Sequence, residues 1–157
     1  AHLDALGFRA GSVVSGYWPI ATEIDVRPLL ARLEGRGAVC ALPVVVEAGA
    51  ALQFRRWALI EDLEDGRHGT RQPMAAAPIV RPQIVLVPLL AFDAEGGRLG
   101  QGGGYYDRTL AALRSDGPVT AIGVGYALQE RAQLPMMATD QRLDWILTED
   151  AMRQVGP

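Results

Sequence analysis

The apolar residues of this chain gather in short runs, separated by polar, glycine-rich or proline-rich stretches. An uninterrupted apolar run of about four to eight residues is typical of a strand that is buried on both faces. Five such runs predict strands, and a sixth run, at residues 52–59, is a weaker candidate. The five runs cover residues 12–17, 38–46, 83–87, 119–126 and 143–147.

Two other stretches carry apolar residues at the spacing of an amphipathic helix. The first covers residues 26–36, and Thr22 or Asp25 is a candidate for its N-terminal cap. The second covers residues 105–114. Residues 61–82 and 93–104 are predicted as loops, and a short helical tail is expected after residue 147.

The alternation of apolar strands with helices predicts an α/β fold. We expect a single domain across residues 1–157, with a mostly parallel sheet and helices on both faces, in a Rossmann-like three-layer arrangement. Right-handed crossovers then place the loops that follow the strands at the carboxyl edge of the sheet. Open sheets of this kind bind ligands at that edge, so residues 93–104 are the first place to look for a site.

Composition narrows the possible functions. The net charge of −3 provides no electrostatic basis for binding nucleic acid or an acidic membrane surface. The longest apolar stretches, such as residues 84–92, are much shorter than the ~20 residues of a membrane span. The one cysteine, Cys40, excludes an internal disulfide and is flanked by apolar residues, which indicates a buried thiol. We therefore expect a cytoplasmic protein.

The basic residues are all arginine, because the 15 Lys and Arg residues include no lysine. A lysine Schiff base and a Walker A phosphate loop are therefore excluded. Any site for an anion must use arginine, backbone N–H groups or a metal ion. The two histidines, His2 and His68, show no partner spacing, and neither is assigned a role.

The segment at residues 87–110 carries the strongest chemical signal, because six glycines precede an aromatic pair, an acid and an arginine. Free N–H groups at the start of the following helix would make the loop a phosphate cradle. Arg98 would add a forked cation, and Asp107 could hold a magnesium ion on a bound polyphosphate. The alternative is a flexible loop in which Asp107 is only a helix-terminal charge. A dinucleotide fingerprint fits poorly, since it belongs directly after the first strand.

These residues resemble the 5-formyltetrahydrofolate cyclo-ligase family, also called methenyltetrahydrofolate synthetases, over nearly the whole chain. The signature is the string Arg-Leu-Gly-x-Gly-x-Gly-Tyr-Tyr-Asp-Arg at residues 98–108. Residues 17–25 (YWPIATEID) are similar to the family's segment of an aromatic, a proline and Glu-Ile-Asp. Further matches follow in the family's order at residues 41–43, 52–54, 122–126, 134–135 and 143–148.

The resemblance implies an enzyme that converts 5-formyltetrahydrofolate to 5,10-methenyltetrahydrofolate with ATP and Mg²⁺, releasing ADP and phosphate. The formyl oxygen would be phosphorylated by ATP, and N10 of the folate would then close the ring. No side-chain nucleophile is needed, so catalysis is positioning and charge stabilisation. The implied partners are the folate and ATP, with no nucleic acid and no membrane, and the protein is expected to be a monomer.

The resemblance also implies roles for individual residues. Arg98, Tyr105 and Asp107 would be catalytic, and Asp107 and Asp140 would hold Mg²⁺. Glu23 would accept hydrogen bonds from the pterin edge, although a helix-start acid is the alternative. The ATP loop would comprise Arg98, Leu99, Gly100, Gln101, Gly102, Gly103, Gly104, Tyr105 and Tyr106. The folate would contact Trp18, Glu23, Phe54, Gln101, Gly102, Gly103, Gly104 and Tyr105.

Two of these roles have equal or plainer alternatives. For Phe54, a place in the hydrophobic core is at least as good an interpretation as stacking on the folate. Asp140, taken alone, reads as a solvated charge or a cap. Trp57 and Trp145 are assigned to the core.

The sequence departs from the family in its positive charge. Family members begin with a basic helix that binds the ATP phosphates, and this sequence begins after the corresponding region, which we interpret as an omitted segment. Many members also carry lysine where Gly103 stands. The alternative function is therefore a non-catalytic relative that sequesters 5-formyltetrahydrofolate. A sugar-phosphate isomerase or acyl-transfer enzyme on a similar sheet has no support from the residues.

Overall fold

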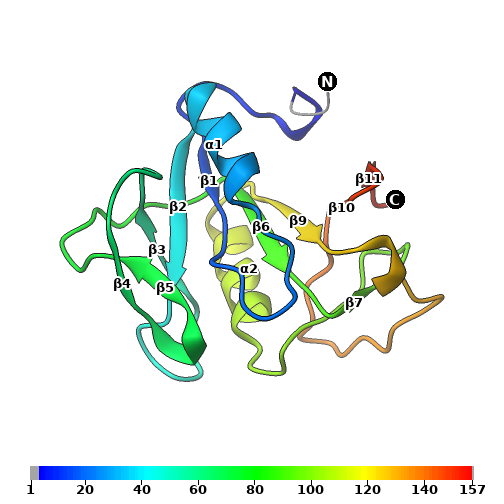
Figure 1. Cartoon of the computed structure of the whole chain (residues 1–157). Coiled ribbons are helices and arrows are strands. Elements are labelled where there is room, and N and C mark those ends of the chain that lie inside the picture. Colours follow the sequence, from blue (N-terminus) through cyan, green and yellow to red (C-terminus); the bar gives the residue numbers. More distant parts are fainter. Residues whose placement is uncertain (1–3, 157) are drawn as a thin grey trace.

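The computed structural model describes residues 4–156 and is built around a seven-stranded sheet (Figure 1). The strands of this sheet are β1 (Val13–Ser15), β2 (Val39–Val44), β3 (Gln53–Arg56), β6 (Ile84–Pro88), β9 (Thr120–Val124), β10 (Trp145–Leu147) and β11 (Met152–Gln154). Their spatial order is β11-β10-β9-β6-β1-β2-β3. Neighbours from β10 to β2 run parallel, whereas the edge strands β3 and β11 are antiparallel to their neighbours.

The central strands are buried on both faces, because their side chains alternate between two separate hydrophobic clusters. On β6, Ile84 and Leu86 belong to one cluster, and Val85 and Val87 belong to the other. The first cluster includes leucines of helix α1 (Arg27–Gly35), and the second includes Leu110 of helix α2 (Tyr105–Asp116). The two helices therefore cover opposite faces of the sheet (Figure 1), and the predicted α/β fold is confirmed.

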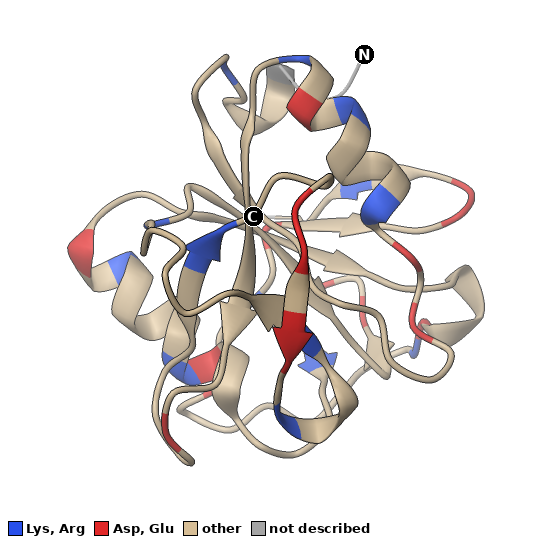
Figure 2. Cartoon of the chain, turned by 60° about the vertical axis from the view of Figure 1, so that its left-hand side comes forward, with Lys and Arg blue, Asp and Glu red and all other residues tan. Residues whose placement is uncertain are grey.

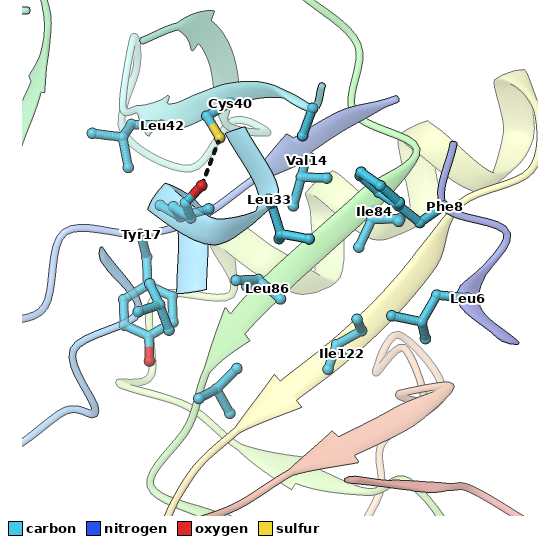
Figure 3. Packing of buried hydrophobic residues seen from close by; sticks show 14 of the residues in the cluster. Leu6, Phe8, Val14, Tyr17, Leu33, Cys40, Leu42, Ile84, Leu86 and Ile122 are labelled. Atoms are coloured by element: carbon cyan, nitrogen blue, oxygen red, sulfur yellow. Dashed lines mark hydrogen bonds between the residues drawn. The ribbon is translucent and has the colours of Figure 1, made fainter. Parts of the chain in front are cut away.

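The cluster under α1 contains the cysteine and the N-terminal segment. Figure 3 shows Leu33, Cys40 and Ile84 packed together, with Leu6 and Phe8 covering the sheet beyond the helix. The Cys40 thiol lies 3.6 Å from the backbone carbonyl oxygen of Leu30. Burial raises the pKa of this thiol to about 11, so it stays protonated at neutral pH. The prediction of a buried thiol is confirmed.

Helix α1 begins later than its predicted caps. The helix starts at Arg27-Pro28. Val26 occupies the N-cap position, and its side chain makes no capping hydrogen bond. Asp25 still contributes, since its carboxylate accepts the Arg27 backbone N–H at 3.0 Å and pairs with the Arg27 guanidinium at 2.8 Å. Within residues 4–156, every helix is too short or too polar to span a bilayer.

The region predicted as a loop at residues 61–82 contains a small second sheet. Strands β4 (Leu63–Asp65) and β5 (Arg71–Pro73) pair antiparallel, and the short 3₁₀ turn η2 (Arg67–Gly69) joins them. The prediction was wrong here because both strands are three residues long and mostly polar, so they lack the apolar alternation that marks a half-buried strand.

Two further predictions were wrong at short strands. The glycine-rich region contains a hairpin of β7 (Ala91–Phe92) and β8 (Arg98–Leu99), and its loop proper begins only after β8. The predicted helical tail is the edge strand β11, which pairs with β10 in antiparallel register. In both cases the strand is determined by antiparallel pairing with the next strand along the chain, and not by the preference of the segment itself.

The packing of α2 yields a stability prediction. Leu110 is fully buried under this helix, so Leu110→Ala should lower the free energy of unfolding by about 2–5 kcal/mol through lost burial and a residual cavity. Urea unfolding followed by far-ultraviolet circular dichroism measures the change. Leu128, which is 89% exposed, provides the control: Leu128→Ala should leave stability within about 0.5 kcal/mol. Equal effects of the two substitutions would contradict the assigned packing.

Candidate active site

Three segments meet at the carboxyl edge of the parallel strands (Figure 1). The first follows β1 and contains Glu23. The second follows β8 and runs through the glycines to the start of α2. The third follows β9 and contains the turn η3 (Ala127–Gln129) and Asp140. This is the edge at which open α/β sheets bind ligands, as the sequence predicted for the glycine-rich loop.

Glu23 is fixed by a tight turn in its own segment. Its backbone N–H donates to the Ile20 carbonyl at 3.1 Å, and its carboxylate accepts the Ile20 N–H at 3.2 Å. Ala21, inside this turn, has a φ of 51°, a left-handed conformation that is strained for a residue with a Cβ. The Tyr17 hydroxyl donates to the Ile24 carbonyl at 2.8 Å and anchors the far side of the turn. The turn therefore holds the carboxylate in one place.

The environment of Glu23 disfavours its charged form. Burial raises the pKa of this carboxyl above its ordinary value, and hydrogen bonding to Ile20 and to the Gln101 side chain offsets part of the rise. Gln101 belongs to the glycine-rich loop, so two predicted site segments that lie far apart in the sequence meet at Glu23.

Two phenols, the buried Tyr17 and the half-buried Tyr106, lie near Glu23. Burial is the main cause that raises the pKa of both Tyr17 and Tyr106, and the charge of Glu23 adds to it in each case. Both hydroxyls are therefore neutral at physiological pH. The Arg98 guanidinium lies 5.7 Å from the centre of the Tyr106 ring. Tyr106 is thus close enough to feel the charges of both Arg98 and Glu23.

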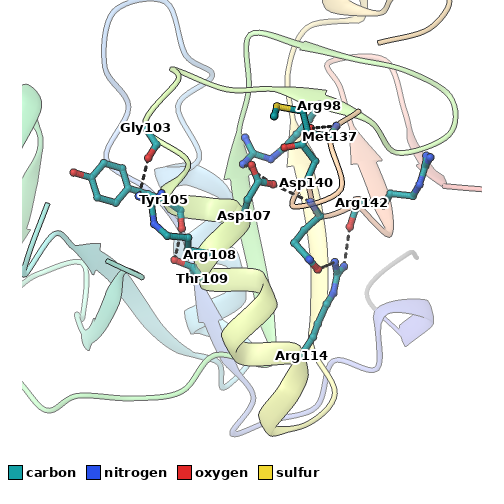
Figure 4. A network of polar contacts seen from close by, with 11 residues as sticks. Arg98, Gly103, Tyr105, Asp107, Arg108, Thr109, Arg114, Met137, Asp140 and Arg142 are labelled. Atoms are coloured by element: carbon teal, nitrogen blue, oxygen red, sulfur yellow. Dashed lines mark hydrogen bonds and ion pairs between the residues drawn. The ribbon is translucent and has the colours of Figure 1, made fainter. Parts of the chain in front are cut away.

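Arg98 and Asp107 form an ion pair at the start of α2 (Figure 4). The Arg98 Nη2 atom lies 3.6 Å from the Asp107 Oδ1 atom, and the Arg98 side chain is only 6% exposed. The Nε atom of Arg98 is buried and has no hydrogen-bond partner among residues 4–156. A buried donor without a partner is costly, so Arg98 retains capacity to bind an anion.

Asp107 also ties α2 to the third segment. Its Oδ1 atom accepts the Gln141 backbone N–H at 2.9 Å. This hydrogen bond holds Gln141, which directly follows Asp140, against the helix. The Asp140 carboxylate itself accepts the Met137 N–H at 2.8 Å (Figure 4), as expected for a cap. The described part of the chain contains no group of three or more His, Cys, Asp or Glu side chains suited to a metal ion. Two carboxylates are enough for Mg²⁺ when phosphate and water complete its octahedron, so Asp107 and Asp140 are the residues that could hold an ion carried by a polyphosphate.

The aromatic candidates differ in their surroundings. Trp18 is half-buried, with the Arg27 guanidinium 4.6 Å from its ring centre and Trp57 6.5 Å away in an edge-on arrangement. Phe54 is 3% exposed and packs in the cluster under α2, which supports the interpretation of Phe54 as a core residue. Trp57 is buried as predicted, and Trp145 is half-buried against the α1 cluster.

The sequence analysis overlooked two residues near the site. Asp93 is a buried carboxylate that accepts backbone N–H groups of Glu95, Gly97 and Leu134 at 2.8–3.0 Å, which joins the β7–β8 hairpin to the third segment. These hydrogen bonds lower its pKa, although burial opposes them. His68, which received no role, lies at the tip of the β4–β5 hairpin with its ring 6.2 Å from the Tyr105 ring. His2 lies outside the described residues.

Figure 2 shows arginine and acidic residues distributed along helices, strands and loops, in keeping with a net charge of −3. The electrostatic character of the site therefore depends on its own few residues. Arg98 and Asp107 oppose each other there, and Glu23 is the next acid in the site.

Comparisons with known proteins agree on one family. The model of the 5-formyltetrahydrofolate cyclo-ligase family matches residues 1–149. The 5-formyltetrahydrofolate cyclo-ligase of Escherichia coli (strain K12) is 37% identical over 131 residues, which cover 80% of this chain and 71% of that protein. The protein of the same name from Mycolicibacterium smegmatis is 33% identical over 120 residues, covering 72% of this chain. This chain spans 62% of the length of that relative.

Solved structures share the fold. The 5,10-methenyltetrahydrofolate synthetase of Aquifex aeolicus is similar with a TM-score of 0.73 and 32% identity, covering 93% of this chain and 72% of that chain. The Mycoplasma pneumoniae synthetase has a TM-score of 0.64 over 86% of this chain and 71% of its own, but at 23% identity it supports the fold alone.

The raised pKa of Glu23 yields a pH prediction. A raised carboxyl pKa means that the folded state binds this proton more tightly than the unfolded state, so ionised Glu23 costs stability at pH 7. Glu23→Gln should therefore be at least as stable as the wild type at pH 7. As the pH falls through the raised pKa, the stability of the wild type increases relative to that of the variant. Urea unfolding of both proteins at pH 7 and pH 5 tests this, and a variant less stable than the wild type at pH 7 would contradict it.

Proposed function

Because the chain belongs to the 5-formyltetrahydrofolate cyclo-ligase family, a family of ligases in folate one-carbon metabolism, we propose that it converts 5-formyltetrahydrofolate to 5,10-methenyltetrahydrofolate and consumes ATP. The products of ATP are ADP and phosphate. The observation that carries the proposal is the meeting of Glu23 with Gln101 beside Arg98 and Asp107. This arrangement joins a carboxylate suited to a pterin with a loop suited to phosphate.

The proposed reaction has two steps. First, the formamide oxygen of the folate attacks the γ-phosphorus of ATP, and the bond from that phosphorus to the bridging oxygen breaks to release ADP. The formyl oxygen, a poor leaving group before this step, can now leave as phosphate. Next, the N10 nitrogen of the folate attacks the activated formyl carbon, N10 loses its proton, and the carbon–oxygen bond breaks to release phosphate. The protein supplies positioning and charge stabilisation, and no side chain forms a bond to the substrate.

Two features support binding of the phosphates by this chain. The N–H groups of Gly102, Gly103 and Gly104 have no acceptor among the described residues, and they precede the N-terminus of a 12-residue helix. Such a terminus favours anions through its free N–H groups and its dipole. The Arg98 guanidinium would add positive charge beside the same phosphates, and Asp107 and Asp140 would hold Mg²⁺. Bound Mg²⁺ neutralises charge on the polyphosphate.

Glu23 is the proposed anchor of the folate. Adjacent N–H donors on the pterin edge match a carboxylate, and the turn at Ile20 keeps that carboxylate fixed. Trp18 and Tyr105 offer rings for stacking, whereas Phe54 is left out of the proposed site because it is buried. Replacing Glu23 by glutamine removes the charge and one acceptor, so affinity for the folate should fall by about 10–100-fold while ATP affinity is kept.

The direct test is turnover of 5-formyltetrahydrofolate with ATP and Mg²⁺. Methenyl product is followed by its near-ultraviolet absorption, and ADP is measured in parallel. We expect both to appear in equal amounts and only when ATP and Mg²⁺ are present together. Folate binding without product would instead support the alternative, a relative that sequesters the folate. Absence of both binding and product would contradict each function.

Asp107 offers a sharper test with a matched control. Asp107→Asn should reduce turnover by about 100-fold or more, while folate affinity stays within about threefold, because only the ATP-dependent step loses a charged ligand. Asp144 also pairs with an arginine and accepts a backbone N–H, but outside the site. Asp144→Asn should therefore leave turnover nearly unchanged. An equal loss of folate binding and turnover in Asp107→Asn would refute the assigned role.

A further inference from the structure

Arg108 connects the glycine-rich loop to its surroundings, although no role has been given to it so far. Its Nη2 atom donates to the Gly103 carbonyl at 2.7 Å, and its guanidinium carbon lies 5.1 Å from the centre of the Tyr105 ring (Figure 4). Its Nε atom donates to the Ala50 carbonyl at 3.4 Å, in the segment that precedes β3. One side chain thus contacts the loop, an aromatic ring of the site and a neighbouring segment.

The contact with Gly103 determines which way a backbone amide points. In a trans peptide the carbonyl and the N–H of one peptide unit point in opposite directions. Because Arg108 holds the Gly103 carbonyl, the N–H of Gly104 must point away from Arg108. Gly104 has a φ of 69°, which glycine adopts without strain, and its N–H has no acceptor among residues 4–156. The guanidinium therefore orients a free donor at the start of α2.

The Tyr105 ring is held by the same group and by the β4–β5 hairpin. Arg108 lies over the ring, and the His68 ring lies 6.2 Å away at an angle of 54°. The Tyr105 carbonyl accepts the Thr109 hydroxyl at 2.6 Å, and that hydroxyl accepts the Leu52 N–H at 2.8 Å. Backbone and ring of Tyr105 are both restrained, and Arg108 is the charged part of that restraint.

We propose that Arg108 is a positioning residue of the nucleotide site. It holds the Gly103 carbonyl outward and the Tyr105 ring in place, so that the Gly104 N–H is presented to a bound phosphate. The inference rests on the proposed function in one respect, namely that the loop binds ATP. A charged hydrogen bond of this kind restrains the loop before the ligand arrives, which reduces the entropy lost on binding.

The experiment measures equilibrium binding of MgATP and of 5-formyltetrahydrofolate by calorimetry, without need of turnover. Arg108→Met keeps the apolar stem and removes the guanidinium, so Kd for MgATP should rise about tenfold. Kd for the folate should rise less, by about threefold at most, because Arg108 restrains only the Tyr105 ring among the proposed folate contacts. Arg108→Lys restores a single cationic donor and should recover part of the ATP affinity, to within about threefold of the wild type. The Lys variant also keeps the test valid if the Met variant folds poorly.

Arg153→Met is the matched control, because Arg153 also combines a ring contact, 5.9 Å from the centre of Phe92, with a charged hydrogen bond, 2.7 Å from Glu130. Its effect on MgATP binding should be negligible. Unchanged MgATP affinity in Arg108→Met, or equal weakening of both ligands, would overturn the inference. If the wild type binds MgATP but shows no turnover, the proposed function is wrong. The MgATP affinities of the wild type and the Arg108 variants would then still test the inference. A wild type that binds no MgATP would overturn both.

Discussion

Burial of both faces of the central parallel strands is the constraint on which the remaining structure depends. Side chains on β6 alternate between the α1 cluster and the α2 cluster, so neither helix can be removed without exposing one face. Parallel strands require crossovers, and each crossover begins at the carboxyl edge. The segments that carry Glu23, Arg98 and Asp140 all leave the sheet at that edge. The site is thus located by the packing of the core.

The elements that the sequence predicted well are those whose local pattern matches their burial. The strand runs at residues 12–17, 83–87 and 119–126 each contain a strand of the parallel sheet, and the leucine spacing at residues 26–36 contains α1. The β4–β5 hairpin and β11 were not predictable in this way, because short polar strands are determined by pairing with a neighbouring strand and carry no apolar pattern of their own. Their composition alone favours loops.

The residues of the candidate site also differ in whether their local sequence pattern predicts them. Glycines followed by an acid at a helix start indicate a phosphate loop from residue types alone, so Arg98 and Asp107 could be proposed without the family. Glu23 and Asp140 could not, because an isolated carboxylate is usually a cap or a solvated charge, and Asp140 does cap a turn. Asp93 and Arg108 escaped prediction for another reason. Their partners are backbone groups, whose directions exist only once the loops are folded.

The described site carries costs that a ligand would relieve. Arg98 has a buried donor without a partner, Ala21 is held in a strained conformation, and burial disfavours the charge of Glu23. Each feature is unfavourable for folding alone, and the surrounding structure must hold them in place. One of these costs lies in the glycine-rich loop region, and the other two lie in the turn that follows β1. In the proposed function, an anion beside Arg98 and paired N–H donors beside Glu23 would offset the costs at these two residues, and ATP and a folate bound next to each other would supply both groups.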